Sequence, residues 1–177
     1  LLRSVLLPLK AVFMNLLSVA VAYGVLVMVF QWGWLESLGL ESTPFIDTIT
    51  PPLVLVIAYG LSMDYEVFLL SRMRELYEES HDNVYAVSEG LASSAKTITS
   101  AALLMVAVFL AFVSAGLPAV QRIGLAMATA VAVDATLVRL VIVPSTMALF
   151  GDANWWLPDF LSRWLPVLET TAPAEGF

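Results

Sequence analysis

Residues 52–70 read Pro-Leu-Val-Leu-Val-Ile-Ala-Tyr-Gly-Leu-Ser-Met-Asp-Tyr-Glu-Val-Phe-Leu-Leu, and this stretch decides the fold class. Its only charged residues are Asp64 and Glu66. A helix needs about 20 mostly apolar residues to cross the hydrocarbon core of a bilayer. In lipid, backbone polar groups must bond to one another, which favours a helix for such a segment. The stretch therefore predicts a membrane-spanning helix with carboxyl groups in its second half.

Three further stretches have the same apolar character: residues 12–30, 98–115 and 123–150. Of the 177 residues, 60% are hydrophobic and 13% are charged, whereas a soluble domain carries about 25% charged residues. The alternative is a soluble α-bundle, but its helices would show a polar face every three to four residues, which these stretches lack. The sequence therefore predicts an all-α membrane protein with a bundle of four transmembrane helices over residues 1–151.

The basic residues predict the orientation of this bundle, since cytoplasmic segments are enriched in Lys and Arg. Six of them fall on one side: Arg3, Lys10, Arg72, Arg74, Lys96 and Arg163. The opposite side holds only Arg122, with Trp32 and Trp34 at the position of an outer aromatic belt. We therefore expect both ends of the chain to be cytoplasmic, together with a loop over residues 72–96. Within that loop we expect a short helix over residues 83–93, with Asp82 as its N-cap.

Residues 152–177 follow Gly151, which we expect to end the fourth helix. Apolar side chains then recur on one face of a possible helix: Leu157, Phe160, Leu161, Trp164, Leu165 and Leu168. This spacing predicts an interfacial amphipathic helix, with a helix docked on a further domain as the alternative, followed by a loose tail from Glu169. Because the chain begins with Leu1 inside an apolar run, we expect it to be an internal or C-terminal piece of a longer protein.

Charged residues inside a spanning helix are costly and therefore indicate function. Asp64 lies about 18 Å along its span at 1.5 Å per residue, just past the midplane. Held away from water beside the Tyr65 phenol, its carboxyl group would take up and release a proton. Gly60, one turn away, would let a partner helix approach closely, and Ser62 would bond between helices. We expect Glu66 to lie nearer the interface and to be solvated.

The fourth span carries a second pair of charges, Asp134 and Arg139. Residues three and four apart face each other on an α-helix, so a spacing of five is poor for a direct pair. We therefore expect each to find a partner on another helix, for example Arg139 with Asp64. The alternative is that these charges only hold helices together.

Enzymatic chemistry has no support in the sequence. It shows no nucleophile–base pair, phosphate-binding glycine loop or metal-ligand cluster, so we expect no enzyme and no cofactor. A net charge of −7 also argues against nucleic acid, which needs a basic surface.

The stretch Gly60-Leu-Ser-Met-Asp-Tyr-Glu-Val-Phe-Leu-Leu-Ser-Arg-Met-Arg-Glu75 closely resembles the MMPL family of the resistance–nodulation–division (RND) superfamily. Further matches follow in the family's order: Leu7–Ala11 with Asn15, Ile98–Ala102, Val133–Arg139 with Pro144, and Gly151–Trp156. The resemblance covers nearly the whole chain, and the Asp-Tyr-Glu motif with its flanks is highly specific.

This resemblance implies a twelve-helix transporter made of two halves and two outer domains, of which this chain would supply the last four helices. Asp64 and Tyr65 match the second-half Asp-Tyr pair of the family's proton relay, while Asp134 and Arg139 match the charged positions of its last helix. The implied activity is export of lipids or other hydrophobic compounds, driven by proton influx across a bacterial plasma membrane. The implied partners are the bilayer, protons, a lipid-like substrate and the N-terminal half of the transporter. The alternative is a lipid- or sterol-sensing bundle, or a scaffold, that does not pump.

Overall fold

The computed structural model describes residues 6–155, and these are almost entirely helical. Four helical stretches are long and apolar enough to cross a membrane: Leu6–Gln31, Thr50–Ser80, Asn83–Val113 and Pro118–Phe150. They are built from α1 (Leu6–Leu26) with the π-helix η1 (Val27–Gln31), α2 (Thr50–Ser80), α3 (Asn83–Val113), and α4 (Pro118–Val133) with the π-helix η3 (Asp134–Ile142) and α5 (Val143–Phe150). Two short 3₁₀-helices, η2 (Glu36–Leu38) and η4 (Gly151–Trp155), complete the order. The prediction of an all-α, multi-pass membrane bundle is confirmed.

Prolines mark where three of these helices begin. Pro51, Pro118 and Pro144 each occupy the first or second position of α2, α4 or α5. At the starts of α2 and α4 proline is tolerated because the N–H groups of the first turn have no partner within the helix; α5 instead continues η3, and Pro144 interrupts the bonding of that continuous helix. A proline further along would break the helix, so Pro51 and Pro118 mark where α2 and α4 start.

The segment 72–96, expected as a loop with a short helix over 83–93, is helical except at one turn. α2 runs on to Ser80 and α3 begins at Asn83, so only His81 and Asp82 separate them. The Asp82 carboxylate accepts hydrogen bonds from the Val84 and Tyr85 amides at 2.9 and 3.1 Å, which confirms it as the N-cap. Charged residues here do not prevent a helix, because they pair along its surface. The amphipathic helix expected after residue 155 lies outside the described residues.

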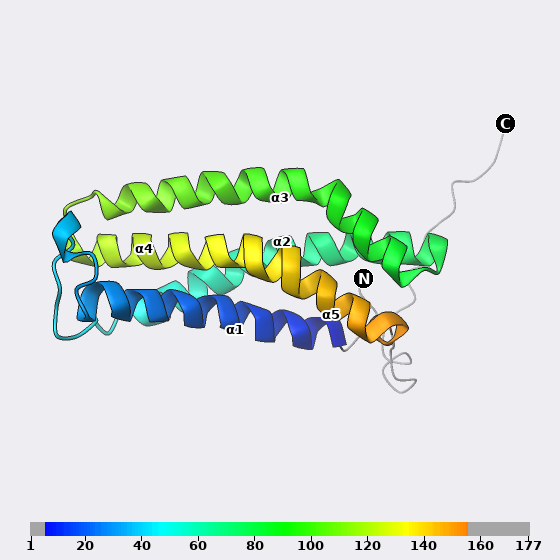
Figure 1. The fold of residues 1–177 in the computed structure, drawn as a ribbon, viewed down its shortest axis with the longest axis horizontal. Coiled ribbons are helices and arrows are strands. Elements are labelled where there is room, and N and C mark those ends of the chain that lie inside the picture. Colours follow the sequence, from blue (N-terminus) through cyan, green and yellow to red (C-terminus); the bar gives the residue numbers. More distant parts are fainter. Residues whose placement is uncertain (1–5, 156–177) are drawn as a thin grey trace.

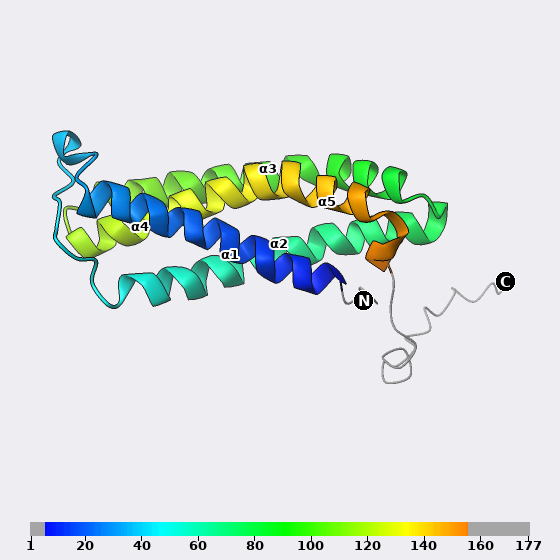
Figure 2. The same ribbon diagram turned by 60° about the horizontal axis from the view of Figure 1, so that its bottom comes forward.

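The two ends of the bundle differ. The loop end holds the connection between α1 and α2 and the turn between α3 and α4; the hairpin end holds the α2–α3 turn, the start of α1 and η4 (Figure 1). Figures 1 and 2 both show α3 and α4 running side by side. At Gly124 of α4 a Cβ atom would lie 2.7 Å from the Phe109 carbonyl oxygen of α3, so glycine permits this close contact.

Apolar side chains form two buried clusters, one towards each end. The loop-end cluster contains Phe30 and Met127, and the hairpin-end cluster contains Met73 and Met147. Along the fourth spanning helix, Ala130 belongs to the first cluster and Val138 to the second. The residues between the clusters include buried polar side chains, and these form the candidate site.

Candidate functional site

A layer of buried polar side chains divides the two apolar clusters. Its members come from three spanning helices: Asn15, Ser18, Ser62, Glu66, Asp134 and Arg139. All but Glu66 line one cavity that contains about 420 Å³ of space not filled by atoms, including its open side, and Tyr65 lines it as well. A cavity that combines charged groups with apolar walls inside a spanning bundle indicates a functional site.

Asp134 and Arg139 form a direct ion pair within one helix. The Arg139 Nη2 and Nε atoms lie 2.7 and 3.1 Å from Asp134 Oδ2. In an α-helix, residues five apart point about 140° away from each other. Here both lie in the π-helix η3, whose i to i+5 bonding brings residues five apart onto one face. The expectation that each would need a partner on another helix is therefore wrong for Asp134.

The sequence offers a local reason for this widening of the helix. Pro144 has no N–H group, so it cannot complete the α-helical ladder just after η3. The Thr136 hydroxyl also donates to the Ala132 carbonyl at 2.5 Å and so competes for a backbone acceptor. Departures from α geometry concentrate at such residues.

Arg139 does find a further partner on α2, but it is not Asp64. Its Nη2 donates to the Ser62 carbonyl oxygen at 2.9 Å. The guanidinium carbon also lies 5.3 Å from the centre of the Tyr65 ring, within range of a cation–π contact. The Nη1 atom is buried and has no hydrogen-bond partner among the described residues. One donor of Arg139 is therefore free for another acceptor.

Asn15 of α1 connects two residues of α2. The Ser62 hydroxyl donates to Asn15 Oδ1 at 2.6 Å, and the Asn15 side chain also bonds to the Glu66 carboxylate. Glu66 is only 8% exposed, so the expectation that it would be solvated is wrong. It follows Ser62 by four residues, which places both on the buried face of α2.

Asp64 lies on a different face of α2. It is exposed within the described residues, as are its apolar neighbours Met63 and Phe68, while Tyr65 is half-buried. Gly60 also faces open space, so no described helix makes a close approach there. The structure thus brings Tyr65, Ser62, Asp134 and Arg139 together and leaves Asp64 and Gly60 on the surface.

A second, smaller cavity lies next to the first, towards the hairpin end. It is lined by Glu66 and by Lys10 of α1, among mostly apolar side chains. The Lys10 ammonium donates to Asn154 Oδ1 at 2.5 Å and lies 4.1 Å from the centre of the Phe150 ring. In the sequence, Lys10 indicates only the orientation of the bundle, and its spacing gives no signal for these contacts with Asn154 and Phe150.

The hairpin end is joined by a network around α5. The Met147 carbonyl oxygen accepts from the side-chain amides of Asn83 and Asn154, at 3.0 and 2.7 Å. Trp155 in turn donates from Nε1 to Asn83 Oδ1 at 3.0 Å and stacks on Tyr77 with ring centroids 4.6 Å apart. These contacts attach α5 and η4 to α2 and α3.

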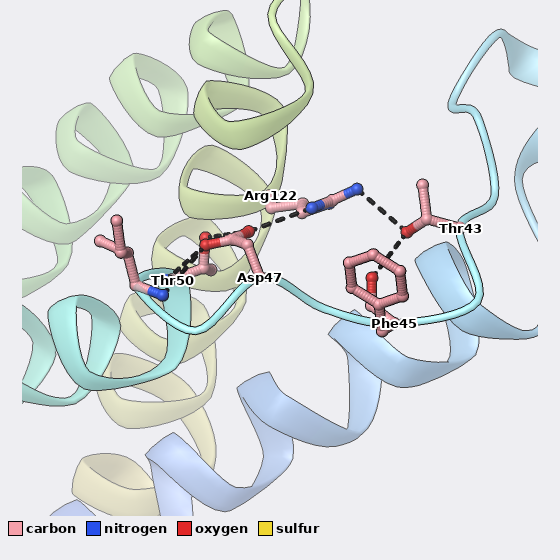
Figure 3. A network of polar contacts seen from close by, with 6 residues as sticks. Thr43, Phe45, Asp47, Thr50 and Arg122 are labelled. Atoms are coloured by element: carbon pink, nitrogen blue, oxygen red, sulfur yellow. Dashed lines mark hydrogen bonds and ion pairs between the residues drawn. The ribbon is translucent and has the colours of Figure 1, made fainter.

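At the loop end, Arg122 of α4 bonds to the segment before α2 (Figure 3). Its Nη1 lies 3.0 Å from Asp47 Oδ2, and its Nη2 donates to Thr43 Oγ1 at 3.0 Å. Asp47 also accepts from the Thr50 amide and hydroxyl, both at 2.8 Å. Burial alone would raise the pKa of the Asp47 carboxyl, but the bonds from Thr50 and Arg122 outweigh it and hold that pKa below its ordinary value. Asp47 therefore stays charged and links α4 to the start of α2.

The chain is similar in sequence to a known family and to several known membrane and transport proteins. The profile of the MMPL family matches residues 1–168. The chain is 54% identical to the mycolic acid-containing lipids exporter MmpL11 of Mycolicibacterium smegmatis and 56% identical to the heme uptake protein MmpL11 of Mycobacterium tuberculosis, over 97% of this chain and 18% of each relative. It is 40% identical to the probable trehalose monomycolate exporter MmpL3 of Mycobacterium leprae, over 94% of this chain and 17% of that protein.

The chain thus spans less than a fifth of the length of these relatives. The profile match and the identities nevertheless extend over nearly all of its own residues. Together with the four apolar helices, they show that the chain belongs to the MMPL family.

Proposed function

We propose that this chain is the C-terminal part of a proton-motive-force-driven exporter of lipids or other hydrophobic compounds, and that it supplies half of the intramembrane proton-relay site. The observation that carries the proposal is the polar layer between the two apolar clusters. Three ionisable groups, Tyr65, Asp134 and Arg139, line its central cavity. Groups of this kind inside a membrane serve proton pathways more readily than packing.

Asp64 and Tyr65 are the relay pair in this proposal. Tyr65 lines the cavity with its ring beside Arg139, whereas Asp64 points outward from the described residues. An isolated carboxylate facing lipid costs about 2.5–3.5 kcal/mol at the bilayer centre. That cost is removed if another part of the full-length protein covers this face of α2. The N-terminal half is the partner we infer, and the relay is complete only when it is in place.

The substrate class follows from the relatives. Two of them are named as exporters of mycolic acid-containing lipids and of trehalose monomycolate. We infer a lipid-like substrate for the full-length protein, in a bacterial plasma membrane, with the hairpin end cytoplasmic. Basic residues near that end, such as Lys10, Arg72 and Arg74, support this orientation.

The test is Asp64→Asn in the full-length protein, reconstituted in vesicles that contain a labelled mycolate lipid. Asparagine keeps the size of the side chain but cannot carry the proton, so we expect loss of gradient-driven lipid release. Glu75→Gln is the matched control, because Glu75 is an exposed carboxylate of α2 in a surface ion pair. Wild-type release by Asp64→Asn would refute the relay, and release that is unaffected when the gradient is dissipated would favour a non-pumping lipid sensor or scaffold.

A further inference from the structure

The central polar layer has more carboxyl groups than cations. Among the described residues, it contains Glu66 and Asp134 as acids and Arg139 as the base. Two nitrogen atoms of Arg139 are bonded to Asp134. The Glu66 carboxylate, which is 8% exposed, bonds to the neutral side chain of Asn15. A carboxylate held this far from water is costly unless a further cation lies near it.

Lys10 of α1 shows the opposite imbalance. Its ammonium donates to Asn154 Oδ1 at 2.5 Å and to the Thr146 carbonyl oxygen at 3.4 Å, and it lies 4.1 Å from the centre of the Phe150 ring. All three partners are neutral, and within residues 6–155 no carboxylate is bonded to this ammonium. A lysine carries three N–H donors, so its two hydrogen bonds leave one donor over. Lys10 is thus a half-buried cation that lacks a counter-ion in the described part of the chain.

The smaller cavity brings these two unbalanced charges together. Glu66 and Lys10 both line it, with Leu7, Met14, Leu70, Val143, Thr146 and Met147. It contains about 210 Å³ of space not filled by atoms, including its open side. A water molecule takes up about 30 Å³ in the liquid, so at least one fits. A water needs polar partners to stay in such a cavity, and the carboxylate and the ammonium supply them.

We propose that Lys10 is the counter-ion of Glu66, that water in the smaller cavity joins the two side chains, and that this pair forms the inner part of the proton route of the exporter. Asn15 lines the central cavity and bonds to Glu66, so one side chain connects the two cavities. Glu66 takes up a proton from water of the central cavity and releases it to water of the smaller cavity, as a hydronium ion. Lys10 balances the carboxylate that remains and transfers no proton itself, so it is a positioning residue.

This pair is separate from the other charged groups of the bundle. Asp134 and Arg139 of η3 act on Glu66 only through their charges, and the Tyr65 ring lies beside Arg139. Asp64 lies on the exposed face of α2 and does not line the smaller cavity. The inference rests on the proposed function, because it extends the proton route from the polar layer towards the hairpin end.

A double-mutant cycle on the full-length protein in detergent tests the pairing. Lys10→Met removes the charge but keeps an unbranched side chain, so Glu66 loses its counter-ion and the melting temperature should fall clearly. Glu66→Gln, added to that variant, removes the carboxylate that had lost its partner, so the double variant should recover most of the fall. Lys96→Met is the matched control, because Lys96 is an exposed lysine of α3. It should change the melting temperature little, and its effect should add to that of Glu66→Gln. Additive losses for Lys10→Met and Glu66→Gln would overturn the pairing.

Release of the labelled mycolate lipid from vesicles separates a proton role from a structural one. Lys10→Arg keeps the charge and should keep release, whereas Lys10→Met should lose most of it. The double variant is decisive, because it regains stability but lacks the carboxyl group that carries the proton, so it should stay inactive. Glu66→Gln alone should show the same loss, and it tests the route even if Lys10→Met fails to insert.

Wild-type release by Glu66→Gln or by the double variant would overturn the inner route. The proposed relay itself fails only if Asp64→Asn retains proton-driven release, so the two failures are distinguishable.

Discussion

Arg122 and Asp47, 75 residues apart in the chain, form an ion pair that joins α4 to the start of α2. The same two helices meet again where Arg139 binds the Ser62 carbonyl. Two arginines of one spanning helix therefore hold α2, at the loop end and at the middle of the bundle.

The loop-end pair should make stability depend on pH. The pKa of Asp47 is lowered in the folded state, so its contribution is fully present above the ordinary carboxyl pKa of about 3.9 and is lost as the pH falls through the lower, folded value. We expect Asp47→Asn to cost about 1–3 kcal/mol at neutral pH. Melting curves of the full-length protein in detergent measure how much higher the wild type melts than Asp47→Asn. This difference should stay constant between roughly pH 7 and pH 5 and should shrink below about pH 4.

Ser42→Ala is the control for this experiment, because Ser42 donates to Glu36 in an exposed bond of the same loop. It should change the melting temperature little at any pH. An advantage of the wild type over Asp47→Asn that grows as the pH falls would contradict the assigned role.

Removal of one partner of the central ion pair should destabilise the protein strongly. Asp134→Ala leaves the Arg139 charge, whose side chain is 5% exposed, without its counter-ion. Breaking a buried pair in this way costs about 3–5 kcal/mol. Unfolding of the full-length protein in mild detergent measures the loss. Glu78→Ala, which breaks an exposed pair with Arg74, should cost less than about 1 kcal/mol; equal losses would argue against a buried central pair.

Two glycines should respond differently to an added side chain. A Cβ at Gly124 would lie 2.7 Å from the Phe109 carbonyl oxygen, a backbone atom that cannot easily move. We therefore expect Gly124→Ala to cost about 1–3 kcal/mol and to separate α3 from α4. A melting temperature equal to that of the wild type would show that the close contact is absent.

Gly60→Ala gives a matched comparison, because a Cβ there meets open space among the described residues. In the full-length protein it reports whether another segment packs on this face of α2. A loss of stability like that of Gly124→Ala would show close packing by another part of the full-length protein, and no loss would place Gly60 against lipid.

Trp155 should stabilise the hairpin end through both its ring and its N–H group. Trp155→Phe keeps an aromatic ring near Tyr77 but leaves the buried Asn83 oxygen without its donor, at a cost of about 1–3 kcal/mol. Trp155→Ala should cost about 3–5 kcal/mol, because removal of the ring also leaves a cavity beside Tyr77. Trp34→Phe, at an exposed position of the loop end, should leave thermal unfolding unchanged; the same effect at both positions would contradict the network.

The membrane class and the spanning helices could be predicted from the sequence, because apolar length alone determines them. The extent of the helices could not. Charged residues near Arg72 and Glu75 read as a loop, but they form pairs one helical turn apart on a continuing α2. Apolarity measures contact with lipid, and a helix that leaves the membrane loses that signal without ending.

The candidate site was predictable in its residue types but not in its geometry. Asp134 and Arg139 stood out as charges in an apolar stretch, yet their spacing argued against a direct pair. Only the π-helix, which depends on Pro144 and on the packing of both helix ends, makes that pair possible. Asp64 and Glu66 are two residues apart in the chain, so they lie on different faces of α2, one exposed and one buried. Which face is buried depends on how α2 is rotated about its axis, and the apolar sequence of residues 52–70 does not specify that rotation.

The α2–α3 turn has a practical consequence. At 1.5 Å per residue, the 31 residues of α2 measure about 46 Å, against a hydrocarbon core of about 30 Å. With the apolar part of α2 in the bilayer core, the ends of α2 and α3 joined by His81 and Asp82 would extend beyond the lipid as a stem of two antiparallel helices. A small rigid protein fused at this tip would keep a fixed angle to the bundle and would serve as a fiducial for imaging a membrane protein largely hidden in a nanodisc.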